Sequence, residues 1–297
     1  MGFWPMVTDA ASPSPASKGE LGILAGGGEL PVLLVDACKA EDRPYFILGI
    51  EGAVDSALLD GEPHARIRIG AIGEALKLLR DEGVEQLVMG GRMKRPGIAS
   101  LKPDATGAKL LARLGKSFFS GDNTLLSSIV SYLEEEGFEV VGADDVLSDL
   151  LAPQGLIGRT PVPKEAARDI EIGVKIAHQI GEMDIGQAVV IQQGYVLGVE
   201  AAEGTDGLIS RCGQLRRNVP YGGVLVKVKK PSQERRVDLP TIGVTTVESI
   251  ARAGLSGVAV EAGGALIINR KAVALKAEAL NVFVVGFSME DDANHGQ

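Results

Sequence analysis

Residues 21–40 read LGILAGGGELPVLLVDACKA, and this stretch decides the fold. A short apolar run, Leu21–Ala25, leads into three glycines at 26–28. A helical pattern follows, with Pro31 in its first turn, where a missing N–H costs little. Strand, glycine loop and helix in this order predict a Rossmann-like sheet whose loop turns backbone N–H groups toward a phosphate or nucleotide. The dinucleotide fingerprint requires glycine where Pro31 stands, so a tight turn without a ligand is the alternative.

The rest of the first half alternates between apolar runs and helical patterns. Strands are expected at residues 45–50, 65–69, 85–89 and 138–141, with helices at 71–82 and 124–136. This alternation favours a mostly parallel sheet. The segment GGRMKRP at 90–96 is expected at the carboxyl edge of the sheet, where open α/β folds bind ligands; a solvated loop is the alternative. Asp122 fits an N-cap or a ligand contact.

Two proline-containing segments separate the halves of the chain, because the stretch between them cannot be helical throughout. We expect a nucleotide-binding Rossmann-like domain at 21–153, a linker at 154–163 and a second α/β domain at 164–297. Residues 1–20, rich in Pro, Ser and Ala, are expected to be a flexible leader. Apolar runs on either side of Gln193-Gly194 predict a hairpin. The fold class is therefore two α/β domains, with a smaller mixed-sheet C-terminal domain.

Composition argues against several classes of protein. The 297 residues carry a net charge of -9, which argues against general nucleic-acid binding. Two cysteines, Cys38 and Cys212, do not make a disulfide framework, so a reducing compartment is expected. The sequence has no uninterrupted apolar run of roughly 18 residues, the length of a membrane span. A hydrophobic content of 45% allows a sizeable core and is compatible with a homodimer.

A charged segment at residues 199–244 contrasts with this acidic background. Eight cations lie between Arg211 and Arg236, with only Glu234 against them. The acidic groups around them are Glu200, Glu203, Asp206 and Asp238. Cations with a few carboxylates suit the binding of a polyphosphate together with a divalent metal. Carboxylates as close as these are costly unless a cation joins them; capping of a helix by Thr205 or Asp206 is the alternative.

Several common catalytic centres are absent from the sequence. The three histidines, His64, His178 and His295, are scattered, and none stands at metal-ligand spacing from a cysteine or an acid. The sequence also contains neither a Gly-x-Ser-x-Gly elbow nor a Walker A motif. The remaining chemistry is that of carboxylates, magnesium and cations acting on phosphate.

Three motifs of the charged segment are EAAEGTD at 200–206, VLVKVKKP at 224–231 and RVDLPTIG at 236–243. Together with residues 21–31, 90–96, 121–122, 184–189 (DIGQAV) and 261–263 (EAG), they resemble the UDP-2,3-diacylglucosamine pyrophosphatases of lipid A biosynthesis. The resemblance is to the magnesium-dependent type that is unrelated to metallophosphoesterases, and it covers nearly all of residues 21–290 in order. Glu234 and Asn123 depart from the family pattern, which has aspartate at both places.

The resemblance implies an activity and its setting. The reaction is hydrolysis of the pyrophosphate bond of UDP-2,3-diacylglucosamine to UMP and 2,3-diacylglucosamine 1-phosphate (lipid X), with Mg²⁺ as cofactor. The lipid substrate is expected between the domains, with the catalytic, phosphate- and lipid-binding groups in residues 164–297. The expected location is a Gram-negative cytoplasm, with transient contact to the inner-membrane surface.

The same resemblance suggests roles for single residues. Asp238 is the expected catalytic carboxylate, either as a magnesium ligand or as the group that activates water. The other candidate metal ligands are Asp206, Glu200 and Glu203. The predicted substrate-binding residues, among them the phosphate clamps Lys227, Lys230 and Arg236, are Gly26, Gly27, Gly28, Gly91, Arg92, Lys94, Asp122, Gln193, Thr205, Lys227, Lys230, Gln233 and Arg236.

Two alternative functions belong to other classes. One is an NAD(P)-dependent oxidoreductase built on the glycine loop, which leaves the charged segment without a role. The other is a non-enzymatic nucleotide or lipid sensor that docks the charged segment on anionic lipid. Carboxylates interleaved with the cations argue against a plain lipid-binding patch.

Overall fold

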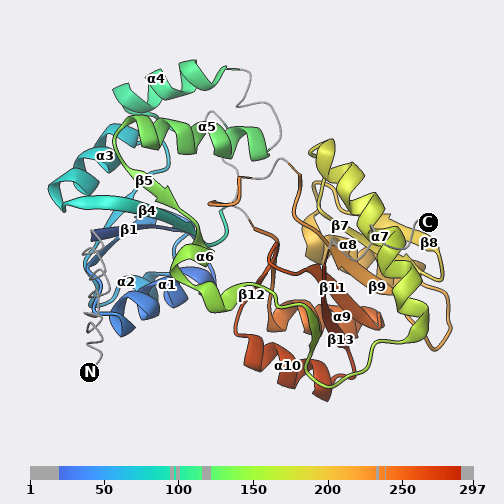
Figure 1. Cartoon of the computed structure of the whole chain (residues 1–297). Helices are drawn as coiled ribbons and strands as arrows, with labels where there is room; N and C mark the ends of the chain where they lie inside the picture. Colours follow the sequence, from blue (N-terminus) through green and yellow to red (C-terminus); the bar gives the residue numbers. More distant parts are fainter. Residues whose placement is uncertain are drawn as a thin grey trace, which may run out of the picture.

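The computed structural model describes residues 20–93, 97, 101–115, 122–231, 234–237 and 239–288, and only the backbone of residues 122 and 123. Within these ranges the chain forms two α/β domains, each built on its own sheet (Figure 1). This arrangement confirms the predicted fold class. No helix in the described ranges combines the length and apolar character needed to cross a bilayer.

The first sheet is parallel throughout, as predicted, in the order β3-β2-β1-β4-β5. Its strands are β1 (Glu20–Ala25), β2 (Tyr45–Ile50), β3 (His64–Ile67), β4 (Val84–Gly90) and β5 (Glu139–Val141). The order runs one way from β1 to β3 and the other way from β4 to β5. The switch point between β1 and β4 is where open α/β sheets bind ligands.

Helices cover both faces of the first sheet. One face carries α1 (Glu29–Ala40), α2 (Ser56–Leu59) and α6 (Ala143–Val146), which share a buried cluster with β1. The other carries α3 (Ile72–Asp81) and α5 (Asp122–Glu135), with α4 (Ala105–Leu114) packed on α3. The sequence does not predict α2, α4 or α6, because α2 and α6 are single turns and α4 is interrupted by Gly107. Asp104 stabilises α4 by accepting hydrogen bonds from Gly107 N–H (2.6 Å) and, in α3, Gly73 N–H (2.7 Å).

The second sheet is mixed, as predicted, in the order β6-β13-β11-β9-β7-β8. Its strands are β6 (Gly155–Ile157), β7 (Ala188–Gln192), β8 (Tyr195–Val199), β9 (Val224–Lys227), β11 (Gly257–Glu261) and β13 (Phe283–Phe287). Strands β9, β11 and β13 are parallel, while β6 and β7 run against their neighbours. Strand β6 lies inside the segment predicted as a linker, so residues 155–157 belong to the sheet instead. The second sheet has six strands and the first has five, so the C-terminal domain does not have the smaller sheet.

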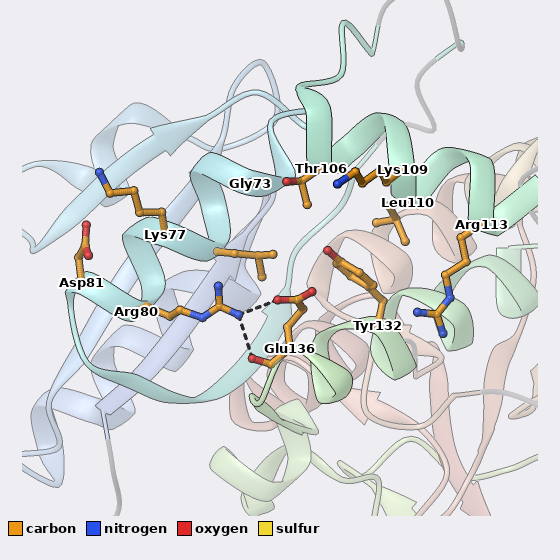
Figure 2. Close-up of a pocket in the computed structure, with 11 residues that line it drawn as sticks. Gly73, Lys77, Arg80, Asp81, Thr106, Lys109, Leu110, Arg113, Tyr132 and Glu136 are labelled. Atoms are coloured by element: carbon orange, nitrogen blue, oxygen red, sulfur yellow. Dashed lines mark hydrogen bonds and ion pairs between the residues drawn. The ribbon is translucent and has the colours of Figure 1, made fainter.

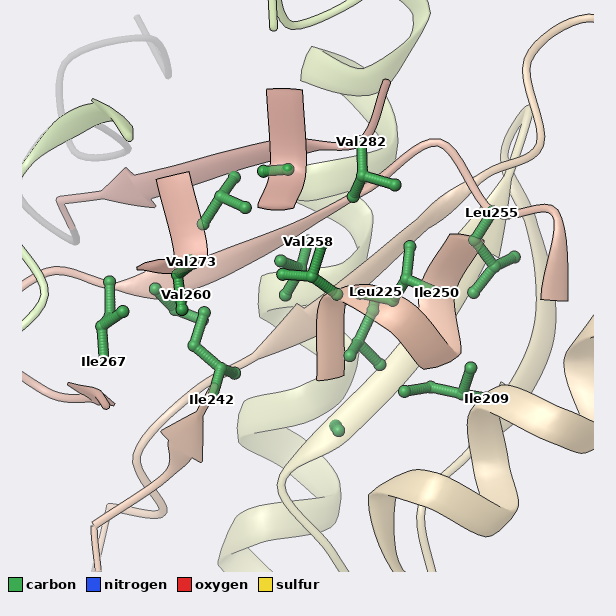
Figure 3. Close-up of a cluster of buried hydrophobic side chains, with 14 of the residues drawn as sticks. Ile209, Leu225, Ile242, Ile250, Leu255, Val258, Val260, Ile267, Val273 and Val282 are labelled. Atoms are coloured by element: carbon green, nitrogen blue, oxygen red, sulfur yellow. The ribbon is translucent and has the colours of Figure 1, made fainter. Parts of the chain in front are cut away.

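The predicted hairpin is confirmed by the antiparallel pairing of β7 with β8. Gln193 and Gly194 both have positive φ (51° and 78°), which is typical of a two-residue type I′ turn. Helix α7 (Lys164–Glu182) covers one face of the second sheet. The other face carries α8 (Gly204–Leu215), α9 (Val244–Ala253) and α10 (Arg270–Ala279). Figure 3 shows the core under these helices, where Ile209, Ile250 and Val273 meet the sheet.

A short parallel pair, β10 (Thr241–Ile242) with β12 (Leu266–Ile267), connects the domains. Leu266 forms a bridge with Leu151, just after the 3-10 helix Ser148–Leu150, and packs in the same cluster as α1. Helix α6 follows β5 directly, and its Asp144 pairs with Arg235, which follows β9. The carboxyl edges of the two parallel strand sets therefore face one another across the domain boundary (Figure 1).

Candidate functional site

The glycine loop after β1 lies at the switch point of the first sheet, but its N–H groups are bound within the protein. Gly26 N–H donates to Gly90 O (2.8 Å), and Gly27 exchanges two backbone hydrogen bonds with Arg92 (3.0 and 2.7 Å). Gly28 N–H donates to Asp55 Oδ2 at 3.3 Å. The three glycine N–H groups therefore bind oxygens of the protein and do not form the predicted phosphate-binding loop.

The glycines instead allow two loops to meet and to place an arginine. A Cβ on Gly91 would lie 2.8 Å from Gly26 C and from Gly27 O, and φ of Gly91 is +96°, so only glycine fits there. The side chain of Arg92 lies over the loop, since a Cβ on Gly28 would be 3.7 Å from Arg92 Nε. This edge thus offers a guanidinium next to the N-terminus of α1, a combination suited to an anion.

At the carboxyl edge of the second sheet, three predicted site residues form one hydrogen-bonded chain. Thr205 Oγ1 donates to Glu200 Oε1 at 2.6 Å, and Lys227 Nζ donates to Thr205 Oγ1 at 3.2 Å and to Thr241 O at 3.2 Å. Glu200 Oε2 accepts from Gln187 N–H at 3.0 Å. Glu200 and Lys227 are both buried. The carboxylate therefore fixes the threonine hydroxyl, and the hydroxyl helps to hold the ammonium at the end of β9.

Lys230 lies just beyond Lys227 and is held by a carboxylate. Its Nζ pairs with Asp184 at 2.7 Å, where α7 ends, and both groups are largely withdrawn from solvent. Between the two lysines, Lys229 N–H donates to Glu261 Oε2 (2.8 Å) at the end of β11. The structure thus brings Lys227 and Lys230 together at one edge, each in a fixed position.

The segment that follows carries its two arginines to the first domain. Arg235 pairs with Asp144 in α6, and Arg236 pairs with Glu134 in α5 and with Glu234 (2.8 Å). Hydrogen bonds and charge from Glu234, and then from Glu134, raise the pKa of the Arg236 guanidinium, and Arg236 lowers the pKa of Glu234. Both arginines fasten the domains to each other. Arg236 is therefore engaged by carboxylates and is not presented as an open phosphate clamp.

The acidic residues expected to bind a metal do not gather in the described structure. Glu203 pairs with Arg211 at 2.6 Å, which holds the pKa of this carboxyl below its usual range, while Asp206 is exposed in the first turn of α8. Both oxygens of Glu200 are occupied by the hydrogen bonds above. Within the described ranges, no group of three or more His, Cys, Asp or Glu residues is placed to bind a metal.

Gln193 lies away from the other predicted site residues. Ala188 pairs with Lys227 and Ile191 with Val224, so the hairpin turn is beyond the opposite end of β9. The buried carboxylate of Asp169 accepts the N–H groups of Gln193 and Gly194, both at 2.7 Å. These contacts assign Gln193 to the turn and not to the Lys227 edge.

Several functional contacts are not predicted from the sequence. Glu134 is an ordinary residue of a predicted helix, and Asp144 lies in α6, which is not predicted. Asp184 and Glu261 lie inside motifs of the family resemblance, which is the one signal that could identify them. Four predicted residues lie wholly or partly outside the description: Asp238, Lys94 and Gln233, and the side chain of Asp122.

A groove of about 570 Å³ lies elsewhere, between α3, α4 and α5 (Figure 2). Arg80 points across it to Glu136, donating to its carboxylate at 2.6 Å, and Lys109 and Tyr132 line the other side. The groove shares no residue with the two carboxyl edges. We therefore place the candidate site at those edges, where the cations converge.

Comparison with known proteins agrees with the two-domain fold. Residues 20–150 match the family model of the LpxI N-terminal domain, and residues 153–285 match that of the LpxI C-terminal domain. The chain is 40% identical over 277 residues to the UDP-2,3-diacylglucosamine pyrophosphatase LpxI of Caulobacter vibrioides, which covers 92% of this chain and 99% of that protein. The chain therefore belongs to the LpxI family.

Proposed function

We propose that this chain hydrolyses the pyrophosphate bond of UDP-2,3-diacylglucosamine, releasing UMP and 2,3-diacylglucosamine 1-phosphate. The observation that carries the proposal is the 40% identity, over almost the full length, to a protein named for its action on this substrate. The site supports it, because cations stand at both carboxyl edges that face the domain boundary. We also propose that the protein works in the cytoplasm at the inner-membrane surface, where a diacylated substrate is available.

The diphosphate is proposed to bind at the carboxyl end of β9. Lys227 and Lys230 are held there by Thr205 and Asp184, so their charge is already in place when the substrate arrives. Donors fixed in advance stabilise the negative charge that develops on phosphate oxygens in the transition state. Arg92, at the switch point of the first sheet, is the matching cation for the nucleotide half.

Asp238 is the proposed catalytic carboxylate, acting on the attacking water. Its chain neighbours support a place at the domain boundary: Val237 packs on the cluster of α3 and α5, and Leu239 on the cluster of α1. Arg235 and Arg236 tie the same segment to the first domain. In this proposal the two domains together position the segment that carries the catalytic group.

Magnesium dependence is part of the proposal, but the described carboxylates do not gather into a metal site. Glu200 has both oxygens occupied and Glu203 is paired with Arg211. Asp206 and Asp238 are the remaining candidate ligands. We therefore assign no step to the metal, and treatment with a chelator followed by added Mg²⁺ tests whether the activity needs it.

The test is release of UMP from UDP-2,3-diacylglucosamine by the wild type, Asp238→Ala and Lys227→Met. Loss of one fixed donor is expected to lower kcat by about 100- to 1,000-fold. Lys175→Met is the matched control, because Lys175 is an exposed lysine on α7. Tight binding of substrate by the wild type without any UMP release would favour the sensor, and a bound cofactor with nicotinamide absorbance would favour the oxidoreductase. The homodimer stays a prediction, to be tested by sedimentation.

A further inference from the structure

The candidate site described so far is polar, whereas the proposed substrate also carries two acyl chains. In UDP-2,3-diacylglucosamine only one sugar ring separates the diphosphate from these chains. An apolar surface is therefore needed about one sugar ring away from the phosphate-binding cations. Large hydrophobic side chains that are exposed beside Lys230 or Arg92 are the candidates.

The turn between α7 and β7, residues 183–187, presents two such side chains next to Lys230. Met183 is 71% exposed and Ile185 is 44% exposed. They stand on either side of Asp184, the partner of Lys230. Helix α7 runs along β9 to its carboxyl end, since a Cβ on Gly181 would lie 3.4 Å from the Cα of Lys230. The turn is therefore at the phosphate-binding edge.

The same turn is fixed to Glu200 on its other side. Gln187 N–H donates to Glu200 Oε2, and Gly186 packs so closely that a Cβ there would lie 2.2 Å from Glu200 O. The turn thus contains Asp184 and contacts Glu200, the two carboxylates that organise the cations. Two exposed apolar side chains held this firmly beside buried lysines are not explained by the packing of the domain itself, because neither is buried in it.

The first domain also has an exposed apolar side chain at its carboxyl edge. Met93 follows Arg92 at the switch point and is 50% exposed. Each of the two facing carboxyl edges therefore combines a cation with an exposed methionine. The unbranched, flexible methionine side chain adapts to apolar partners of variable shape, as an acyl chain requires.

We propose that Met183 and Ile185, with Met93 on the opposite edge, contact the acyl chains of the substrate. The proposal rests on the proposed function and names the part of the substrate that these residues recognise. Charge complementarity orients the molecule, because the diphosphate is drawn to Lys230 while the chains lie on the adjacent apolar side chains.

The test compares two substrates in detergent solution: the long-chain substrate and an analogue in which acetyl groups replace both chains. The variant is Met183→Gln/Ile185→Asn, which removes apolar character without adding charge. Its KM for the long-chain substrate is expected to rise about tenfold, because part of the usual gain from burying such side chains is lost. Its kcat, and its KM for the acetyl analogue, are expected to match the wild type. Leu275→Gln is the control, since Leu275 is 61% exposed on α10, which lies against a different face.

Three outcomes would overturn the inference: an unchanged KM, an equal rise for both substrates, or a defect seen only when the substrate is presented in phospholipid vesicles. The last would mean that the turn contacts the bilayer instead of the substrate. Equilibrium binding of 2,3-diacylglucosamine 1-phosphate to the same variants gives a readout without turnover, and it should weaken about tenfold. If the wild type releases no UMP from either substrate, the proposed function fails, and the binding measurement still decides the inference.

Discussion

Thr205→Val tests whether one hydroxyl holds the cationic edge together. The change keeps the shape of the side chain but removes the group that donates to Glu200 at 2.6 Å and accepts from Lys227 at 3.2 Å. Each hydrogen bond to a charged group contributes about 1.5–3 kcal/mol, and the bond to Lys227 is long, so we expect a destabilisation of about 2–3 kcal/mol. The loss should be measurable by urea unfolding followed by circular dichroism.

The functional effect follows from the same geometry. Lys227 keeps Thr241 O as an acceptor, so its ammonium is displaced and not lost, and kcat/KM should fall about tenfold, less than for removal of the donor itself. Thr205→Ser should restore both properties, and Thr245→Val, at an exposed position of α9, should change neither. Glu200→Gln should reduce the cost of Thr205→Val, because no buried carboxylate then depends on the hydroxyl. Additive effects, or a destabilisation below about 0.5 kcal/mol, would refute the reasoning.

Three further predictions concern the domain boundary and the glycine loop. Arg235→Ala should destabilise the fold by about 2–3 kcal/mol and Asp144→Asn by less, because the Asp144 side chain is 1% exposed whereas the Arg235 side chain is 53% exposed. Adding Asp144→Asn to Arg235→Ala should restore stability in urea unfolding, and a further loss of stability would contradict this. Gly91→Ala should raise the KM for UMP release by displacing Arg92, whereas Gly52→Ala, which has positive φ but open space around its Cβ, should leave KM unchanged. Arg236 holds the pKa of Glu234 below its usual range, so this pair contributes stability above the ordinary carboxyl pKa, and the contribution is lost as the pH falls through the lowered pKa. Glu234→Gln should therefore flatten the dependence of stability on pH over this acidic range, and an unchanged dependence would be contrary evidence.

The elements that could be predicted from the sequence are those whose signal is local. Strands β1, β2 and β11 can be predicted directly, because each is an apolar run that is bounded by glycine or a charged residue and is long enough to be recognised as a strand. Strand β6 was predicted as linker, since it has three residues near two prolines and exists through its pairing with β13. What makes these residues a strand is β13, which lies more than a hundred residues further along the chain, so the local sequence pattern does not predict it.

The candidate site shows the same division. Glu200 and Glu203 are close in sequence, which suggests a shared metal, but the chain turns between β8 and α8, so one carboxylate faces Gln187 and Thr205 while the other faces Arg211. Arg235 and Arg236 find their carboxylates 91 and 102 residues away, in the other domain. Such pairings depend on how the domains meet, and charge patterning along the chain does not report that.

Those interdomain pairs decide which cations are available to the substrate. An arginine held by a carboxylate of the other domain would have to break that pair before it could bind a phosphate, and Arg236 has two carboxylates to leave. Lys227 meets no such requirement in its contacts with Thr205 and Thr241, because both are neutral oxygens that a phosphate can join without displacing a charge. In the proposed function, Arg235 and Arg236 therefore hold the two domains together, while Lys227, Lys230 and Arg92 bind the diphosphate. The same charged segment thus serves two purposes, and its cations divide between them according to where their carboxylate partners lie: Arg235 and Arg236 pair with residues of the first domain, whereas Lys230 pairs with Asp184 of its own domain.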